Sequence, residues 1–312
     1  MSRIKTVFIV GPTASGKTGL GVSLAEKFSG EIVSADSMQI YKGIHIASAA
    51  PDTEEMRGIP HHLLEFLEPS DNYSVADYVK TARGVIEDIK KRGRLPMVVG
   101  GTGLYISSLA DNTEYTEEET DYLLRSSLES RFDEIGAEQM LKELAEFDPD
   151  TAARLHPNNR RRIIRAFEVY KITGKTITEQ NSLSHMGKKY IEPLLIGINY
   201  RDREKLYERI NLRVDIMLKR GLLEEARTAL LNDGGAVQAI GHKELAGFLK
   251  GECSLDEAAE NLKMQTRRYA KRQLTWFNRD KRISWIYADE TDDVVKEAAR
   301  LIKEFSEREQ TE

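Results

Sequence analysis

One eight-residue stretch near the N-terminus constrains the fold of this 312-residue chain more than any other feature. Gly11-Pro-Thr-Ala-Ser-Gly-Lys-Thr18 matches the pattern G-x-x-x-x-G-K-[ST] at every fixed position. It follows the β-branched run Thr6–Val10, which predicts a strand. It precedes Thr18–Phe28, whose apolar residues at four-residue spacing predict a helix. A strand, a glycine-rich loop and a helix in this order indicate a phosphate-binding loop within an α/β sheet.

The chemistry of this phosphate loop follows from its residue types. Glycines let the backbone N–H groups converge on phosphate oxygens, and the dipole of the following helix adds positive potential. Lys17 supplies a mobile positive charge, and the Thr18 hydroxyl supplies a metal ligand. We therefore expect a diphosphate or triphosphate, with Mg²⁺ as cofactor, to bind Gly11, Pro12, Thr13, Ala14, Ser15, Gly16, Lys17 and Thr18.

Alternating strand and helix signals indicate one α/β core that carries an insertion. Strands that are apolar throughout predict a parallel sheet with helices on both faces. From about Asp111 to Lys189 the pattern indicates helices alone. We therefore predict an α/β fold, a P-loop NTPase-like parallel sheet covered by helices, with an all-helical insertion domain. The catalytic core with its C-terminal helices is expected at 1–111 plus 189–312, and the insertion at 112–188.

The individual elements follow from the same patterns. Besides the strand that precedes the phosphate loop, strands are expected at 31–35, 95–99, 193–199 and 284–287. Besides the helix that follows the loop, helices are expected at 75–90, 123–132, 137–147, 160–172, 203–220, 222–231, 242–249 and 255–278. Residues 304–312 are expected to form a charged, frayed tail.

Composition excludes several classes of protein. No apolar run approaches the roughly 18 residues of a membrane span, so no membrane partner is expected. The single cysteine, Cys253, excludes a disulfide scaffold and favours a reducing compartment, so we expect a cytoplasmic protein. His61 and His62 have no acidic or cysteine partners at ligand spacing, and we interpret them as structural residues rather than zinc ligands.

The position of one carboxylate bears on the type of reaction. Motor and switch NTPases usually hold Mg²⁺ with an acid at the end of another apolar strand, but here the strand 95–99 ends in Gly100-Gly-Thr-Gly103. The acid follows a different strand, as Asp36. A carboxylate close to the phosphate loop suits removal of a proton from an acceptor, which favours a group transferase. Taken alone, Asp36 is equally typical of a simple turn.

An ordered set of further motifs gives the chain a specific resemblance. Together with the phosphate loop, they resemble those of the tRNA dimethylallyltransferases, also called tRNA isopentenyltransferases, over most of the chain. The motifs are Asp36-Ser-Met-Gln-Ile-Tyr41, Pro60-His-His-Leu63, Gly100-Gly-Thr-Gly-Leu-Tyr105, His156-Pro-Asn158, Arg165-Ala-Phe-Glu168, Thr173-Gly-Lys175, Gln238-Ala-Ile-Gly241 and Arg268-Tyr-Ala-Lys-Arg-Gln-Leu-Thr-Trp276.

This resemblance implies a reaction and its partners. Members of that family transfer the dimethylallyl group of dimethylallyl diphosphate to N6 of adenosine 37, next to the tRNA anticodon, and release diphosphate. The phosphate loop would then hold a leaving group rather than drive hydrolysis. The expected partners are dimethylallyl diphosphate and the tRNA anticodon stem-loop, whose target base must leave its stack to be modified. A monomer is our default expectation.

The resemblance also implies roles for individual residues. Asp36 corresponds to the base that takes the proton of the adenine amine. Thr13 and Thr102 correspond to positions near the diphosphate and the amine, and Arg213 to an arginine that contacts the diphosphate. The catalytic set is therefore Asp36, Thr13, Thr102 and Arg213. The expected tRNA-binding residues are Asp36, Ser37, Met38, Gln39, Thr102, Arg161, Arg162, Arg165, Gln238, Lys243, Arg268 and Arg272.

Local charge explains how an acidic chain would bind RNA. The chain has 46 Lys and Arg against 51 Asp and Glu, a net charge of −5, which by itself argues against a nucleic-acid partner. Cations nevertheless gather at Arg160–Arg165 and at Arg267–Arg272, each within one predicted helix. By composition alone both stretches are typical of solvated helix faces. The resemblance favours RNA contact, whereas Tyr269 and Trp276 are expected to pack in the core rather than to stack on bases.

One segment departs from the family pattern. Members commonly have Gly-Thr-Ala-Lys shortly after the position of Tyr41, but this chain has Ala47-Ser48-Ala49-Ala50 and lacks the lysine. We expect weaker substrate binding if that lysine contacts RNA or diphosphate. Three other functions stay open from the residues: a small-molecule kinase, an enzyme that prenylates free adenine nucleotides, and a non-catalytic RNA-binding module. The complete phosphate loop and Asp36 count against the last of these.

Overall fold

The computed structural model describes residues 3–115, 121–184, 187, 189–231 and 239–308. The chain divides into two compact units, Met1–Asp111 with Lys189–Glu312 and Asn112–Lys188. The first is the α/β core, and each unit has a hydrophobic core of its own. Within the described residues, we find no helix with the length and apolar character that a membrane crossing requires.

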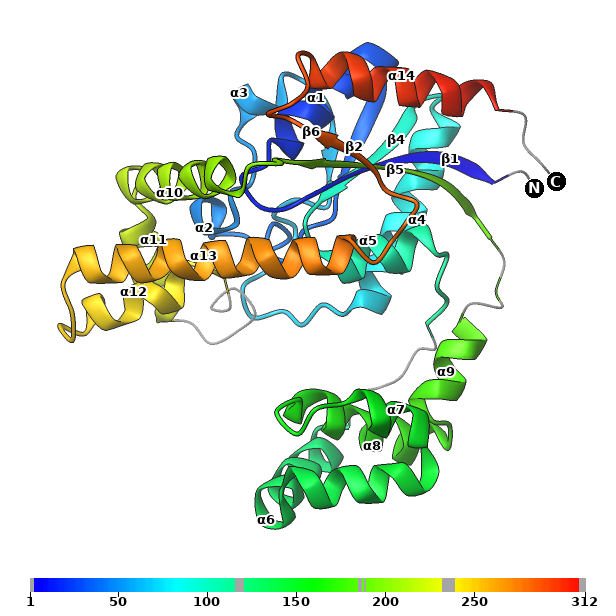
Figure 1. Ribbon diagram of the computed structural model, residues 1–312, viewed down its shortest axis with the longest axis vertical. Helices are drawn as coiled ribbons and strands as arrows, with labels where there is room; N and C mark the ends of the chain where they lie inside the picture. The colour runs from blue at the N-terminus through cyan, green and yellow to red at the C-terminus, as the bar shows by residue number, and fades with distance from the viewer. Residues whose placement is uncertain (1–2, 116–120, 185–186, 188, 232–238, 309–312) are drawn as a thin grey trace. The chain divides into compact units, whose positions relative to one another are not determined.

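A six-stranded parallel sheet forms the centre of the first unit (Figure 1). The sequence predicts the parallel sheet and five of its strands, but not the two-residue strand at 61–62. Its strand order is β3-β2-β4-β1-β5-β6, and every pairing in it is parallel. The strands are β1 (Ile4–Val10), β2 (Gly30–Ser34), β3 (His61–His62), β4 (Leu95–Gly100), β5 (Ile191–Asn199) and β6 (Ser284–Tyr287). Since the strands are parallel, the loops that follow β1, β2 and β4 lie along the same edge of the sheet.

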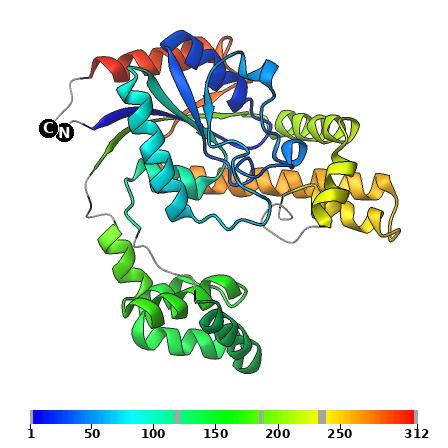
Figure 2. The same ribbon diagram turned by 180° about the vertical axis from the view of Figure 1, so that it is seen from behind.

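Helices cover both faces of this sheet (Figures 1 and 2). Helices α1 (Lys17–Phe28) and α14 (Val294–Glu307) pack on one face, and α4 (Val75–Lys91) and α5 (Gly103–Ala110) pack on the other. Strand β1 shows why its sequence is apolar throughout. Val7 and Ile9 pack in the core on the face that α1 and α14 cover. Phe8 and Val10 pack in the core on the face that α4 and α5 cover.

The chain after β5 adds a helical layer beside the carboxyl edge of the sheet. It consists of α10 (Arg203–Lys219), α11 (Leu222–Leu230), α12 (His242–Leu249) and α13 (Leu255–Phe277). Val214, Leu222, Leu245 and Leu262, one from each helix, are buried in a common cluster. The side chains of Ile46 and Ala47 pack against that cluster, so this layer also supports the short helix α2 (His45–Ser48), which follows β2 in the chain. Helix α3 (Thr53–Met56) comes next.

The described part of the second unit consists of helices. They are α6 (Tyr122–Phe147), α7 (Pro149–Arg154), α8 (Arg160–Thr173) and α9 (Ile177–Ser184). Helix α6 covers the two predicted helices 123–132 and 137–147, and Gly136 between them has a left-handed φ of 79° that breaks the helical path. In α8, Ile163 and Phe167 are buried in the core of this unit. Tyr170, on the same helix, is 39% exposed and stacks on Phe147.

Several elements differ from the sequence-based expectation. Helices α5 and α14 were not predicted, and the expectation of a frayed tail from residue 304 is wrong for residues 304–307, the last turn of α14. Burial of Ala298, Ile302 and Phe305 against the sheet holds this helix to its end. His61 and His62 form the edge strand β3, where His62 Nε2 lies 2.7 Å from a carboxylate oxygen of the buried Glu31.

Candidate active site

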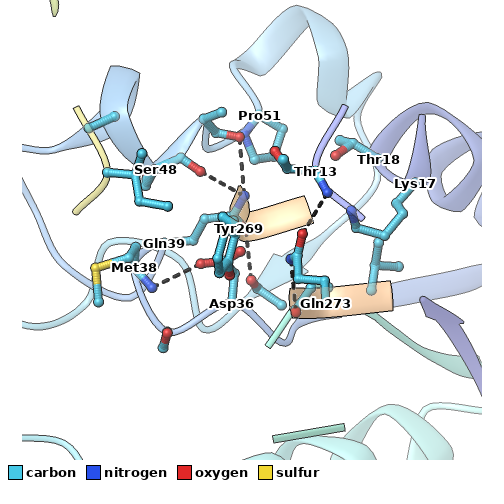
Figure 3. Close-up of a pocket in the computed structure, with 18 of the residues that line it drawn as sticks. Thr13, Lys17, Thr18, Asp36, Met38, Gln39, Ser48, Pro51, Tyr269 and Gln273 are labelled. Carbon is cyan, nitrogen blue, oxygen red and sulfur yellow. Dashed lines mark hydrogen bonds between the residues drawn. The ribbon is translucent and has the colours of Figure 1, made fainter. Parts of the chain in front are cut away.

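Three loops of the first unit meet at the carboxyl edge of the sheet. They are the phosphate loop after β1, the segment 35–39 after β2, and the segment 101–103 after β4. Between them and helices α10 and α13 lies a cavity of about 320 Å³, which we call the site cavity (Figure 3). Of the predicted site residues, the cavity is lined by Thr13, Lys17, Thr18, Asp36, Ser37, Met38, Gln39, Arg213 and Arg272. Residue types and motifs in the sequence therefore located this cavity.

The phosphate loop is held in shape by its neighbours. Lys17, the first residue of α1, donates from Nζ to the carbonyl of Pro12 in its own loop at 2.6 Å. Arg209 on α10 donates from Nε to the carbonyl of Ala14 at 2.9 Å. Ala14 has a left-handed φ of 62°, so this contact stabilises the loop where its backbone is strained. A cationic loop beside a helix N-terminus is a site for phosphate oxygens.

The electrostatics of the site cavity favour an anion. Burial lowers the pKa of Lys17 to about 7, the Arg213 guanidinium acts in the same direction, and the Asp36 carboxylate opposes both. Burial also lowers the pKa of Arg213, against the opposing charges of Asp36 and Glu55. The half-buried side chains of Lys17 and Arg213 therefore share one cavity with the Asp36 carboxylate. A phosphate group bound between them would supply the missing negative charge.

The loop that carries Asp36 is fastened to the loop after β4. Asp36 accepts the backbone N–H of Met38 on Oδ1 at 2.9 Å, which fixes the carboxylate at the cavity wall. Thr102, the N-cap residue of α5, does not line the cavity. Its hydroxyl accepts the N–H of Ser37 at 2.9 Å and donates to the Ser37 hydroxyl at 3.3 Å. Thr102 therefore acts on the Asp36 loop through Ser37.

The segment 47–51 forms a further wall of the cavity. It includes Ala47, Ser48 and Ala49, which belong to the stretch that departs from the family pattern. The Gln39 side chain donates to the carbonyl of Ala49 at 3.1 Å and accepts the Ser34 hydroxyl at 2.8 Å. Ala49 has a left-handed φ of 47°, so a non-glycine residue is strained in this wall.

Helix α13 contributes residues to the site that were not assigned to it from the sequence. Tyr269 and Gln273, one turn apart, line the cavity, so the expectation that Tyr269 packs in the core is wrong. Burial raises the pKa of the Tyr269 hydroxyl far above its usual value, and Asp36 adds to the rise, so the hydroxyl stays protonated. Tyr269, Gln273 and Trp276 recur at helical spacing in the sequence, but such a mixed stripe does not reveal whether it faces a core or a cavity.

The other predicted RNA-binding residues lie outside the cavity. Arg268 is exposed on α13, and Lys243 is exposed on α12. In the second unit, Arg161 and Arg162 are exposed on α8, whereas Arg165 donates to the buried Glu168 carboxylate at 2.9 Å. Gln238 lies outside the described residues. The described residues of this group therefore lie on helix surfaces and do not line the site cavity.

The fold and the cavity define a class of protein. A parallel sheet with the phosphate loop after its central strand is the P-loop architecture. Here the loop, the Asp36 carboxylate and the Arg213 guanidinium line one cavity, an arrangement that suits a transferase holding a phosphorylated donor.

Comparison with known proteins gives the family. The family model described as IPP transferase matches residues 39–280, and the model described as Isopentenyl transferase matches residues 4–67. The first match covers more than half of the chain. This chain belongs to the IPP transferase family.

Individual relatives agree with this assignment. A tRNA dimethylallyltransferase of Caldanaerobacter subterraneus is 47% identical over 92% of this chain and 93% of its own. One from Geobacillus thermodenitrificans is 49% identical over 90% of each chain. A solved tRNA isopentenylpyrophosphate transferase of Bacillus halodurans matches with a TM-score of 0.70 at 40% identity, covering 97% of this chain and 98% of its own. A eukaryotic dimethylallyltransferase acting on tRNA matches with a TM-score of 0.84 at 31% identity, covering 99% and 81%.

Proposed function

We propose that this protein is a tRNA dimethylallyltransferase. It transfers the dimethylallyl group of dimethylallyl diphosphate to N6 of adenosine 37 of tRNA and releases diphosphate. The observation that carries the proposal is the site cavity, in which the phosphate loop with Lys17, the Arg213 guanidinium and the Asp36 carboxylate line one space. Membership of the IPP transferase family supports the choice of donor and acceptor.

The donor half of the reaction is assigned to the cations. Breaking the allylic C–O bond leaves positive charge on carbon and negative charge on the diphosphate oxygens. The Lys17 ammonium, the Arg213 guanidinium and the loop N–H groups oppose that growing negative charge in the site cavity. Because their charge is most useful when the bond has broken, they stabilise the transition state more than the bound donor.

The acceptor half is assigned to Asp36 and its support. The lone pair of the adenine N6 amine is delocalised into the ring, so the amine is a weak nucleophile until its proton leaves. Asp36 takes that proton as the N6–C bond forms, and diphosphate departs with the electron pair of the broken C–O bond. Met38 N–H holds one carboxylate oxygen of Asp36, while Thr102 holds the loop through Ser37. Thr13, on the cavity wall, is assigned to the diphosphate side.

We propose Mg²⁺ as the metal cofactor. The Thr18 hydroxyl lines the cavity beside Lys17, and a hydroxyl oxygen is a ligand that Mg²⁺ accepts. Among the described residues there is no group of three or more His, Cys, Asp or Glu side chains that would form an all-protein metal site. This donor set fits an ion held by Thr18 together with phosphate oxygens, which is how Mg²⁺ is commonly bound. When bound, it would neutralise charge on the diphosphate.

Two cationic helix faces are assigned to tRNA. Arg268 and Arg272 lie one turn apart on α13, and Arg272 reaches the mouth of the site cavity. Arg161 and Arg162 are exposed on α8, so we propose that the unit 112–188 is a tRNA-contacting domain. Lys243 is assigned to the same function. Arg165 is already paired with Glu168, so its contribution to RNA binding is expected to be smaller.

A labelling experiment tests this function. The protein is incubated with labelled dimethylallyl diphosphate and Mg²⁺, with either unmodified tRNA or AMP as acceptor. Label at adenosine 37 of tRNA supports the proposal. Label in AMP alone points to a free-nucleotide prenyltransferase, and turnover of ATP with a small acceptor points to a kinase. Absence of any transfer, with tRNA still bound, points to an RNA-binding module.

Variants assign the base. Asp36→Asn keeps the size of the side chain and is expected to lower transfer by at least about 100-fold, a general-base effect, while inorganic diphosphate still binds. Asp88→Asn is the matched control, because that carboxylate is exposed on α4 and pairs with Lys91 alone among the described residues. Full activity of Asp36→Asn would show that another group takes the proton. A steep loss of tRNA binding with salt is expected if the cationic faces are used.

A further inference from the structure

The Gln273 side chain joins two loops of the site that lie far apart in the sequence. Gln273 is 5% exposed on α13. Its Oε1 accepts the backbone N–H of Thr13 at 2.8 Å, and its Nε2 donates to the carbonyl of Gly101 at 3.0 Å (Figure 3). A backbone N–H only donates and a carbonyl only accepts, so these bonds fix which end of the amide faces each loop.

Each of the two loops belongs to a different half of the reaction. Thr13 is part of the phosphate loop, whose Lys17 and Thr18 face the donor's diphosphate. Gly101 precedes Thr102, which holds the Asp36 loop through Ser37. The amide of Gln273 therefore spans the distance between the donor side and the acceptor side. The contact between Thr102 and Ser37 joins the loop after β4 to the Asp36 loop after β2, but it does not reach the phosphate loop.

The surroundings of this amide are fitted closely to it. A Cβ added at Gly101 would collide with the Gln273 amide nitrogen, so the absence of a side chain there allows the approach. The Gln273 side chain is 5% exposed although it lines the cavity, so little of the amide is open to competing water. A glutamate here would keep an acceptor for Thr13 but would point an oxygen at the carbonyl of Gly101. Glutamine is thus the residue whose chemistry matches both partners.

We propose that Gln273 is a positioning residue for the transfer reaction. Its amide sets the separation between the donor's diphosphate, on the phosphate loop, and the Asp36 carboxylate that receives the acceptor's proton. The inference rests on the proposed function, since it assumes a donor and an acceptor that meet in the site cavity. Reacting atoms must be held about 3–3.5 Å apart, and a displacement of about 1 Å can cost about 100-fold in rate.

A test variant and a matched control examine the proposal by kinetics. Gln273→Met keeps the length of the side chain and removes both hydrogen bonds. Its kcat for transfer to tRNA is expected to fall at least about tenfold, while the dissociation constants for inorganic diphosphate and for tRNA stay within about threefold of the parent, as expected for lost alignment rather than lost binding. Gln265→Met is the matched control: Gln265 is on the same helix, contacts Asn261 at 3.4 Å and does not line the cavity. Its kcat is expected to equal that of the parent.

Amide hydrogen exchange gives a readout that does not depend on activity. Exchange at the Thr13 N–H is expected to accelerate in Gln273→Met, which removes its acceptor, and to stay slow in Gln273→Glu, which keeps it. Should Gln273→Met not fold, Gln273→Glu carries the kinetic test, because it loses the bond to Gly101 and is expected to show the same fall in kcat with a protected Thr13 amide.

Three results would overturn the inference. The first is a kcat within about twofold of the parent in folded Gln273→Met. The second is unchanged exchange at Thr13 in that variant. The third is a rise in the dissociation constant of inorganic diphosphate that equals the fall in kcat, which would make Gln273 a support of the phosphate loop alone. A parent enzyme that transfers nothing to tRNA refutes the proposed function instead, and this inference falls with it.

Discussion

The Glu225 carboxylate holds the wall of the site cavity, and replacing it tests how that wall is built. Glu225 lies on α11 with its side chain 10% exposed. Its Oε2 accepts the N–H of Ile46 at 2.7 Å, and its Oε1 accepts the N–H of Ala47 at 2.8 Å. His242, which is fully buried, lies 3.3 Å from Oε1 through Nε2. One carboxylate therefore accepts two backbone N–H groups of α2, the helix that leads into the cavity wall at 47–51.

The perturbation is Glu225→Gln, which keeps shape and removes charge. Glutamine has a single acceptor oxygen, so one of the two N–H groups must face the side-chain NH₂ of the variant. A charge-assisted bond is worth about 1.5–3 kcal/mol, and an orphaned donor costs about 1–3 kcal/mol. Because Ile46 and Ala47 are half-buried and water can reach part of this turn, we expect a loss of about 2 kcal/mol.

Urea unfolding of the parent and variant measures this loss. Glu224→Gln is the matched control. Glu224 is the residue next to Glu225, but its carboxylate is 72% exposed and contacts Arg227 at 3.7 Å. That variant is expected to change the free energy of unfolding by less than about 0.5 kcal/mol. The KM for tRNA is expected to rise in Glu225→Gln alone, since the loosened segment lines the cavity. Equal stability of the two variants would refute the reasoning.

Three further predictions concern stability. The Arg92 guanidinium holds the pKa of Glu31 below its ordinary value of 4.5, so the unfolded chain protonates first and stability is lost as pH falls from 4.5 towards the lower folded value. Glu31→Gln should therefore lose less stability than the parent between about pH 5 and pH 3 in urea titrations. The buried hydroxyl of Tyr78 has no hydrogen-bond partner among the described residues, so Tyr78→Phe should raise the melting temperature, whereas Tyr41→Phe, which loses a bond to a backbone carbonyl, should lower it. Gly84 lies within α4, and a Cβ added there would meet open space. Gly84→Ala should therefore raise the free energy of unfolding, measured by urea titration, by about 0.5–1 kcal/mol.

The parts of the fold that sequence predicts are those that local periodicity determines. The strands at 95–99 and 193–199 are apolar because both faces of the sheet are covered, and they lie within β4 and β5. Helix α14 escaped prediction although its buried residues are spaced as in any amphipathic helix. Its many charged residues resemble a solvated tail, and only the presence of the sheet gives Ala298 and Ile302 a place to be buried.

The parts of the site that sequence did not predict depend on long-range contacts. The phosphate loop and Asp36 are visible because residue type and neighbouring strand define them. Gln273 contacts Thr13 across 260 positions, and Glu225 contacts Ile46 across 179. Neither side chain lies in a motif whose spacing specifies such a partner. Their roles follow from which loops the packing of α11 and α13 brings within reach.

The net charge of −5 says little about this protein because its functional electrostatics are local and unfavourable. Burial lowers the pKa values of both Lys17 and Arg213, so at each position the fold disfavours the charged form of the side chain. Both side chains line the same cavity. The diphosphate of the proposed donor would supply the opposite charge there and favour the charged forms, so the arrangement that is unfavourable in the empty protein would strengthen the complex. The shared cavity and the two lowered pKa values together support the proposed assignment of this part of the site to the donor.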